Sequence, residues 1–211
     1  MKKIFWTYII VGLMSFLGLS SSVAALSLDF VPSSQTVVSG GLATVDLEVS
    51  GLTGISPYIG GFDVFVDFDP TLLGFVSFSY GQYLGDPTIF EALTQLSLIN
   101  PGEVEIAEVS FLSPADLGTL QGGLTQFSLG TVAFDTVGTG TSDLNIALAN
   151  VTGLVDQNGD PLYPSLVPGS ITVTSPGPGP APVPEPGTIF LVSVGLANVI
   201  AVVKRNKLRM N

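Results

Sequence analysis

Between residues 26 and 174 the chain consists of short segments in which apolar and polar residues alternate. In the segment 61–69 every second residue from Phe62 to Phe68 is apolar, and the residues between them are aspartates except for Phe65. Segments 44–50 and 143–148 alternate in the same way. Alternation with a period of two residues predicts β-strands that have one face on a core and one face in solvent.

Further apolar segments and the turns between them complete this pattern. Five more strands are predicted at 26–31, 73–80, 104–111, 127–134 and 170–174. Gly130 shifts the apolar phase of its strand, which predicts a β-bulge. Turn residues separate the strands at 39–41, 100–102, 138–140 and 158–159. Helical periodicity is almost absent, so we expect an all-β fold, an antiparallel jelly-roll sandwich.

Composition and charge exclude several classes of function. The chain has no cysteine and no histidine, which excludes a disulfide framework, a thiol nucleophile, a histidine base and His- or Cys-built zinc sites. The net charge is −11, which argues against nucleic acid as a partner. All 17 acidic residues lie between Asp29 and Glu185, and the six basic residues lie outside that stretch.

The N-terminal end has the features of an export signal. Lys2 and Lys3 precede an uncharged apolar run at 4–19, and small residues follow as far as Ala25. This order predicts a signal peptide at 1–25 that is cleaved after Ala25. The alternative is a permanent N-terminal membrane anchor.

The C-terminal end has four consecutive parts. A Pro/Gly-rich stretch at 175–183 predicts an extended linker, and Pro184-Glu185-Pro186 follows it. Residues 187–203 carry no charge and predict a short transmembrane helix. The basic tail 204–211 is expected to stop membrane transfer through its cationic side chains, which are Lys204, Arg205, Lys207 and Arg209.

This arrangement at 184–211 resembles the PEP-CTERM sorting signal of exported bacterial proteins. The resemblance implies recognition by an exosortase-type membrane protease, with cleavage near Pro184, Glu185 and Pro186. It also implies an inner-membrane intermediate, followed by the cell surface or extracellular matrix of a Gram-negative bacterium. The alternative is a plain single-pass membrane anchor with a proline-rich stalk.

The region 26–174 resembles the cohesin family and related carbohydrate-binding sandwiches. Residues 37–40 lead into the strand 44–49 like the opening hairpin of that family, and residues 60–70 end in a similar Phe-Asp-Pro turn. Residues 129–158 resemble a late hairpin of the family. The resemblance implies a nine-stranded jelly roll with a sheet face that binds a protein partner or a polysaccharide, and no fixed set of binding residues.

Two acidic clusters are candidate sites. Asp63, Phe65, Asp67 and Asp69 are expected to share one sheet face, which is either a solvated acidic surface or a face for a partner or a cation. Asp156, Asn158 and Asp160 have the spacing of the first ligands in a calcium loop. Pro161 and Val167 stand where an EF-hand needs Gly and Glu, so a tight Asn-Gly turn is the favoured interpretation and calcium the alternative. No other cofactor is expected.

A catalytic role would require paired carboxylates. Glu103 and Glu105 share a strand face, and Glu108 is expected on the opposite one. The region after Trp6 has no Lys, Arg, His or Trp up to Val203 to complete an active site. The aromatic residues that could stack on sugars, or else pack in the strands, are Tyr58, Phe65, Phe75, Tyr80 and Tyr83.

The sequence therefore favours a non-catalytic exported protein that binds a protein or polysaccharide at the cell surface. A cohesin-type adaptor for a specific exported protein is the first alternative. A polysaccharide-active enzyme that uses Glu103 and Glu105, or the acidic cluster at 63–69, is the second.

Overall fold

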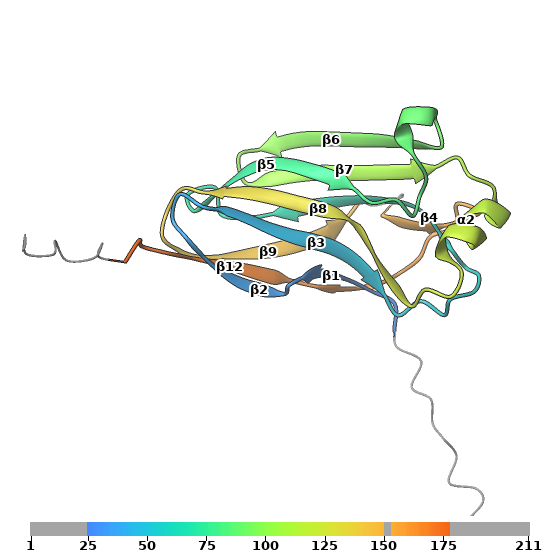
Figure 1. Cartoon of the computed structure of the whole chain (residues 1–211), viewed down its shortest axis with the longest axis horizontal. Coiled ribbons are helices and arrows are strands. Elements are labelled where there is room, and N and C mark those ends of the chain that lie inside the picture. Colours follow the sequence, from blue (N-terminus) through green and yellow to red (C-terminus); the bar gives the residue numbers. More distant parts are fainter. Residues whose placement is uncertain (1–24, 150–152, 178–211) are drawn as a thin grey trace, which may run out of the picture. The chain divides into compact units, whose positions relative to one another are not determined.

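The computed structural model describes residues 25–149 and 153–177, which form two β-sheets packed face to face (Figure 1). Within these residues no helix is both long enough and apolar enough to span a membrane. Several predicted segments lie outside the described residues. They are the predicted signal peptide up to residue 24, the predicted linker after residue 177, the Pro184-Glu185-Pro186 motif, the predicted span 187–203 and the basic tail.

The first sheet has the strand order β11-β1-β3-β8-β5. Its neighbours pair antiparallel except β1 and β11, which are parallel. The strands are β1 (Ser27–Val31), β3 (Leu42–Ser50), β5 (Leu73–Tyr80), β8 (Gln126–Thr136) and β11 (Ser165–Val167).

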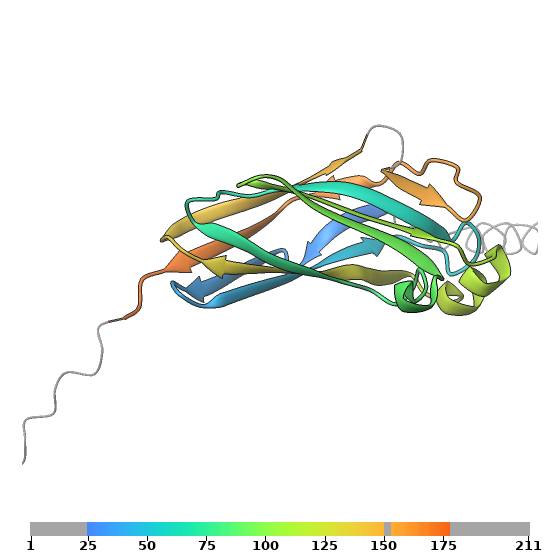
Figure 2. The ribbon, with the colours of Figure 1, turned by 90° about the horizontal axis from the view of Figure 1, so that it is seen from above.

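The second sheet has the order β2-β12-β9-β4-β7-β6, and β10 pairs with β4 beside this path. Only β2 and β12 pair in parallel. The strands are β2 (Ser34–Val38), β4 (Ile59–Asp67), β6 (Ala92–Asn100), β7 (Glu103–Ser110), β9 (Gly140–Leu148), β10 (Leu154–Asp156) and β12 (Gly169–Thr174). Two short helices, η1 (Pro87–Ile89) and α2 (Pro114–Gln121), lie at the end of the sandwich opposite to the end of β12 (Figures 1 and 2).

The core lies between the two sheets and consists of the apolar residues that alternate along the strands. Phe62, Val64 and Val66 of β4 point inward, as their alternation predicts. The rings of Phe68 and Phe134 meet edge to face with centroids 5.0 Å apart. The buried residues of this core extend from Leu28 to Val173, so the segment 26–175 contains every core residue of the part of the chain that the structure describes.

The all-β sandwich is confirmed, and so is the bulge at Gly130, where β8 gains one residue against β3. Three details are wrong. The predicted opening hairpin does not form, because the chain crosses from the second sheet (β2) to the first (β3) at a turn that contains Gly40 with φ +83°. The predicted late hairpin is likewise a crossing, from β8 to β9. The described residues form twelve strands, not the nine that the resemblance implied.

Candidate functional site

The outer face of the second sheet brings together the residues that were singled out in the sequence. In the β4–β7 ladder Gly61 lies opposite Val109, Asp63 opposite Ala107, and Phe65 opposite Glu105. Successive side chains of a strand point to opposite faces, so all of these side chains lie on the solvent face. The ladder therefore runs from small and apolar residues at one end to acidic residues at the other.

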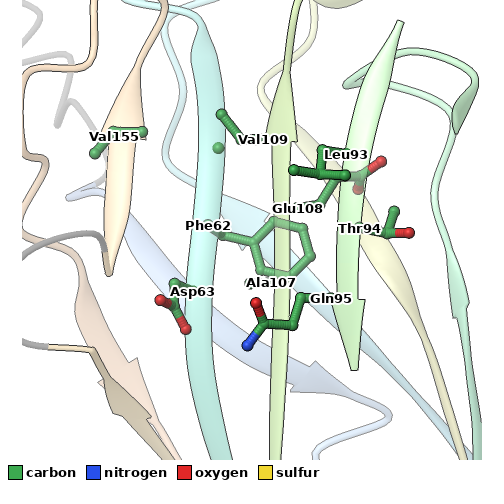
Figure 3. A pocket seen from close by; sticks show the side chains of 10 residues that line it. Phe62, Asp63, Leu93, Thr94, Gln95, Ala107, Glu108, Val109 and Val155 are labelled. Carbon is green, nitrogen blue, oxygen red and sulfur yellow. The ribbon is translucent and has the colours of Figure 1, made fainter. Parts of the chain in front are cut away.

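At the apolar end lies a groove of about 390 Å³ over strands β10, β4, β7 and β6. Figure 3 shows Val155, Val109 and Leu93 around one end of this groove, and Asp63 and Gln95 toward the other. The groove exists because two diagonal positions of its floor, Gly61 and Ala107, have little or no side chain.

The floor cannot accept a larger residue at Gly61 without movement of the backbone. A Cβ atom built there would lie 2.9 Å from the carbonyl oxygen of Glu108 and 3.3 Å from Cα of Val109. Leu93 on the wall of the groove is 61% exposed, although it is a large apolar residue. A depression with exposed apolar walls is typical of a surface that binds another molecule.

The opposite end of the same face is acidic. Asp67 of β4 lies directly across from Glu103 of β7. Asn100 donates a hydrogen bond of 2.7 Å to Glu103, and Gln95 donates one of 3.2 Å to Glu105. The sequence has no basic residue between Ile4 and Val203, so these carboxylates have no cationic neighbour from their own domain. The face therefore attracts cationic groups from outside.

Asp69 lies just beyond the strand, and it lines a shallow hollow together with Asp67 and Asp143. Strand β4 ends at Asp67, and Asp69 lies in the turn that follows. Its carboxylate accepts hydrogen bonds from the backbone N–H and the hydroxyl of Thr71, and these bonds lower the pKa of Asp69. Asp63, Phe65 and Asp67 do share the outer face, as predicted.

Glu108 lies on the inner face of β7, between Phe62 of β4 and Thr94 of β6. It is only 2% exposed, and neither carboxylate oxygen has a hydrogen-bond partner within the described part of the chain. Burial raises the pKa of Glu108 to about 7. The pKa of Tyr80 rises to about 12, first because it is itself buried and second because of the charge of Glu108.

This position removes Glu108 from any carboxylate pair with Glu103 or Glu105. Glu103 and Glu105 lie on the solvent face of β7, and Glu108 points into the core from the other face. The sheet separates the two groups, so they cannot flank one glycosidic bond as an acid and base pair.

The loop with Asp156, Asn158 and Asp160 forms the tight turn that was favoured over a calcium loop. The backbone N–H of Gly159 donates to the carbonyl of Asp156, and Gly159 has φ +83°. The Asp156 carboxylate accepts hydrogen bonds from the backbone N–H groups of Asn158 (2.8 Å) and Asp160 (3.0 Å). Among the described residues no group of three or more His, Cys, Asp or Glu side chains is placed to hold a metal ion.

Most of the aromatic residues named as candidates for sugar stacking pack against other rings. Phe75 contacts Phe134, Tyr80 contacts Phe78, and Tyr83 contacts Phe127. Phe65 is the candidate that the ladder places on the outer face. Sequence reasoning missed strand β6, which supplies Leu93, and thus the groove itself. It also missed helix α2, although Ser113-Pro114 before Asp116 is a typical helix start.

The architecture can now be compared with known proteins. No protein-family model matches the sequence, and no curated protein is similar enough to count as a relative. Solved structures do match. The chain has the fold of cohesin modules.

Three of these cohesins illustrate the likeness. CaCohA2 from Clostridium acetobutylicum is 17% identical, with a TM-score of 0.56 over 77% of this chain and 97% of that one. The sixth cohesin of scaffoldin B from Acetivibrio cellulolyticus, in complex with a Cel5 dockerin, is 15% identical, with a TM-score of 0.56 over 72% and 100%. The OlpA cohesin of Clostridium thermocellum, in complex with Doc918, is 13% identical, with a TM-score of 0.55 over 72% and 100%.

Proposed function

We propose that this protein is an exported, non-catalytic adaptor that docks a protein partner on the outer face of the β9-β4-β7-β6 sheet. The observation that carries the proposal is the groove over Gly61 and Ala107, with Leu93 exposed on its wall. Cohesins with this fold have been solved in complex with dockerins, which supports a role in protein–protein binding.

The groove and the acidic end define the chemistry of the partner. A volume of about 390 Å³ takes one or two apolar side chains, and such anchors usually carry most of the binding energy of an interface. Around them, Asp67, Glu103 and Glu105 offer only carboxylates. Every ionic contact must then use a lysine or arginine of the partner. We therefore expect a partner with an apolar tip ringed by basic residues, whose affinity falls as salt is added.

A protein fits this face better than a polysaccharide does. Sugar-binding surfaces stack sugar rings on exposed aromatic side chains. On this face only Phe65 is available among the aromatic candidates, because Phe75, Tyr80 and Tyr83 pack against other rings. The capture experiment described next distinguishes a protein ligand from a polysaccharide ligand, because it identifies the molecule that the sandwich retains.

The test is affinity capture with three versions of residues 26–175. The wild type, Leu93→Glu and the control Val137→Glu are immobilised, and the host's extracellular fraction is passed over each in calcium and then in chelator. Leu93 and Val137 are 61% and 60% exposed, so the two substitutions are matched in exposure, but Val137 lies outside the groove. We expect one protein, identified by mass spectrometry, on the wild type and on Val137→Glu but not on Leu93→Glu. Equal retention on all three versions contradicts docking at the groove, and retained polysaccharide instead of protein contradicts the adaptor role.

We further propose that a PEP-CTERM-type signal sorts the chain. In this proposal the signal peptide is removed after Ala25, the span 187–203 halts the chain in the inner membrane, and an exosortase-type protease cleaves near Pro184-Glu185-Pro186. The support comes from the order of these segments and the basic tail Lys204, Arg205, Lys207 and Arg209. Glu185→Ala should accumulate full-length protein in the membrane fraction, whereas Pro180→Ala in the linker should not. Normal processing of Glu185→Ala contradicts the proposal.

A further inference from the structure

Two long edge strands, β5 and β6, lie on the same side of the sandwich and carry no charged residue. Each ends its own sheet, and the hydroxyl of Tyr80 on β5 donates a hydrogen bond of 2.6 Å to the backbone carbonyl of Gln95 on β6. Figure 1 shows β6 along the margin of the sandwich with β5 next to it. Elsewhere the domain carries acidic residues on most of its strands and loops. We call β5 and β6, with the exposed residues Val76, Leu96 and Leu98, the uncharged side.

This side lacks most of the features that usually protect sheet edges. Natural edge strands are kept from pairing by charged side chains, by proline, by bulges or by being very short. Strands β5 and β6 have eight and nine residues, with no charge and no proline, although each has one bulge. The edges at the other side, β2 and β11, have only five and three residues. Val76 and Leu98 are nevertheless 48% and 58% exposed, which leaves apolar surface in water.

The charge distribution of the domain determines where a second copy can approach it. All charged residues between Ile4 and Val203 are acidic, so two copies of the domain repel each other wherever their acidic surfaces meet. The edge strands β2 and β11 carry no charge either, but they are short, so the uncharged side offers a second copy the longest contact without opposing carboxylates. A two-fold arrangement also needs one self-complementary patch and no second site.

We propose that two copies of this chain associate side by side, with Val76, Leu96 and Leu98 of one copy packed against the same residues of the other. The outer face of the second sheet remains free for a partner, because Leu93 of the same strand points to that face. The dimer and the proposed docking are therefore independent. A dimer would present two docking faces at once.

The first test is sedimentation of residues 26–175 at low and high salt, up to about 200 μM, because small interfaces give weak affinities. We expect a monomer–dimer equilibrium that tightens with salt, since salt screens the repulsion between acidic copies and strengthens apolar contacts. Leu98→Glu should weaken the dimer by at least about tenfold, because each copy then brings a carboxylate into the apolar contact. Leu93→Glu, on the other face of the same strand, should leave the dimer unchanged.

A second variant guards against misfolding of Leu98→Glu. Val76→Glu places the same charge on β5 and should weaken the dimer equally.

The absence of cysteine offers an independent measurement, since a single Leu98→Cys can form only an intermolecular disulfide. Under mild oxidation it should form covalent dimers at least about tenfold faster than Leu93→Cys, which reports random collision. A domain that stays monomeric at all salts, or a dimer that Leu93→Glu breaks and Val76→Glu spares, overturns the proposal. Neither result tests the separate proposal that a protein partner docks at the groove.

Discussion

Replacing Glu108 by glutamine should stabilise the domain at neutral pH and leave it unchanged in acid. Glu108 is buried without a hydrogen-bond partner within the described part of the chain, and its pKa rises from an ordinary 4.5 to about 7. Each pKa unit corresponds to about 1.4 kcal/mol, so the ionised form costs the folded state about 3 kcal/mol. Glutamine has almost the same shape but cannot ionise.

The sign of the effect follows from the raised pKa. Below pH 4.5 the carboxyl is neutral in both the folded and the unfolded chain, so the full stability is present. Between pH 4.5 and about 7 the unfolded chain ionises and the folded chain does not, so stability falls as pH rises. Above about pH 8 the loss is complete, and we expect Glu108→Gln to exceed the wild type by about 3 kcal/mol.

The assay is urea unfolding followed by far-UV circular dichroism from pH 4 to 9. Fluorescence is unsuitable because Trp6, the only tryptophan, lies within the predicted signal peptide. Asp29 and Glu48 also have raised pKa values, from burial, so only the difference between the wild type and the variant isolates Glu108. Glu105→Gln on the solvent face serves as the control. A wild type and Glu108→Gln that differ by the same amount at every pH would refute the reasoning.

Two other predictions concern the loop and the helix. Asp156→Ala should lower the free energy of unfolding by about 2 kcal/mol, because two backbone N–H groups lose a charged acceptor. Calcium should leave the wild-type melting temperature unchanged, and a clear rise on adding calcium would contradict the turn interpretation. Gln121→Ala should cost about 3 kcal/mol in denaturant unfolding, because the Gln121 side chain bonds both the N–H and the carbonyl of Ile59 as well as the carbonyl of Tyr83. The exposed Thr119→Ala is its control, and equal stability of the two variants would refute the role of Gln121.

The sequence predicted those features that depend on local patterns. Alternation placed Phe62, Val64 and Val66 in the core, and the phase shift located the bulge at Gly130. The Asn-Gly dipeptide predicted the turn after Asp156. These features require only neighbouring residues, so one sequence is enough to read them.

Features that depend on pairing between distant strands were missed or misplaced. Strand β6 has no regular alternation, because Leu96 and Leu98 of its inner face lie at an uncovered edge and stay exposed like Leu93 of the outer face. The groove requires Gly61 and Ala107 to lie diagonally across from each other, and only the β4–β7 register places them so. The crossing after β2 is decided by the pairing of that strand with β12, far along the chain.

The central claim is that a protein partner docks over the groove, and NMR chemical-shift mapping tests it most directly. Isotope-labelled residues 26–175 are titrated with the captured protein, and the backbone amides are followed. We expect the shifts to cluster at Gly61, Leu93, Ala107 and Val109, and to be lost in Leu93→Glu. Shifts that cluster on the outer face of β1, β3 and β8, with none around the groove, would contradict the account.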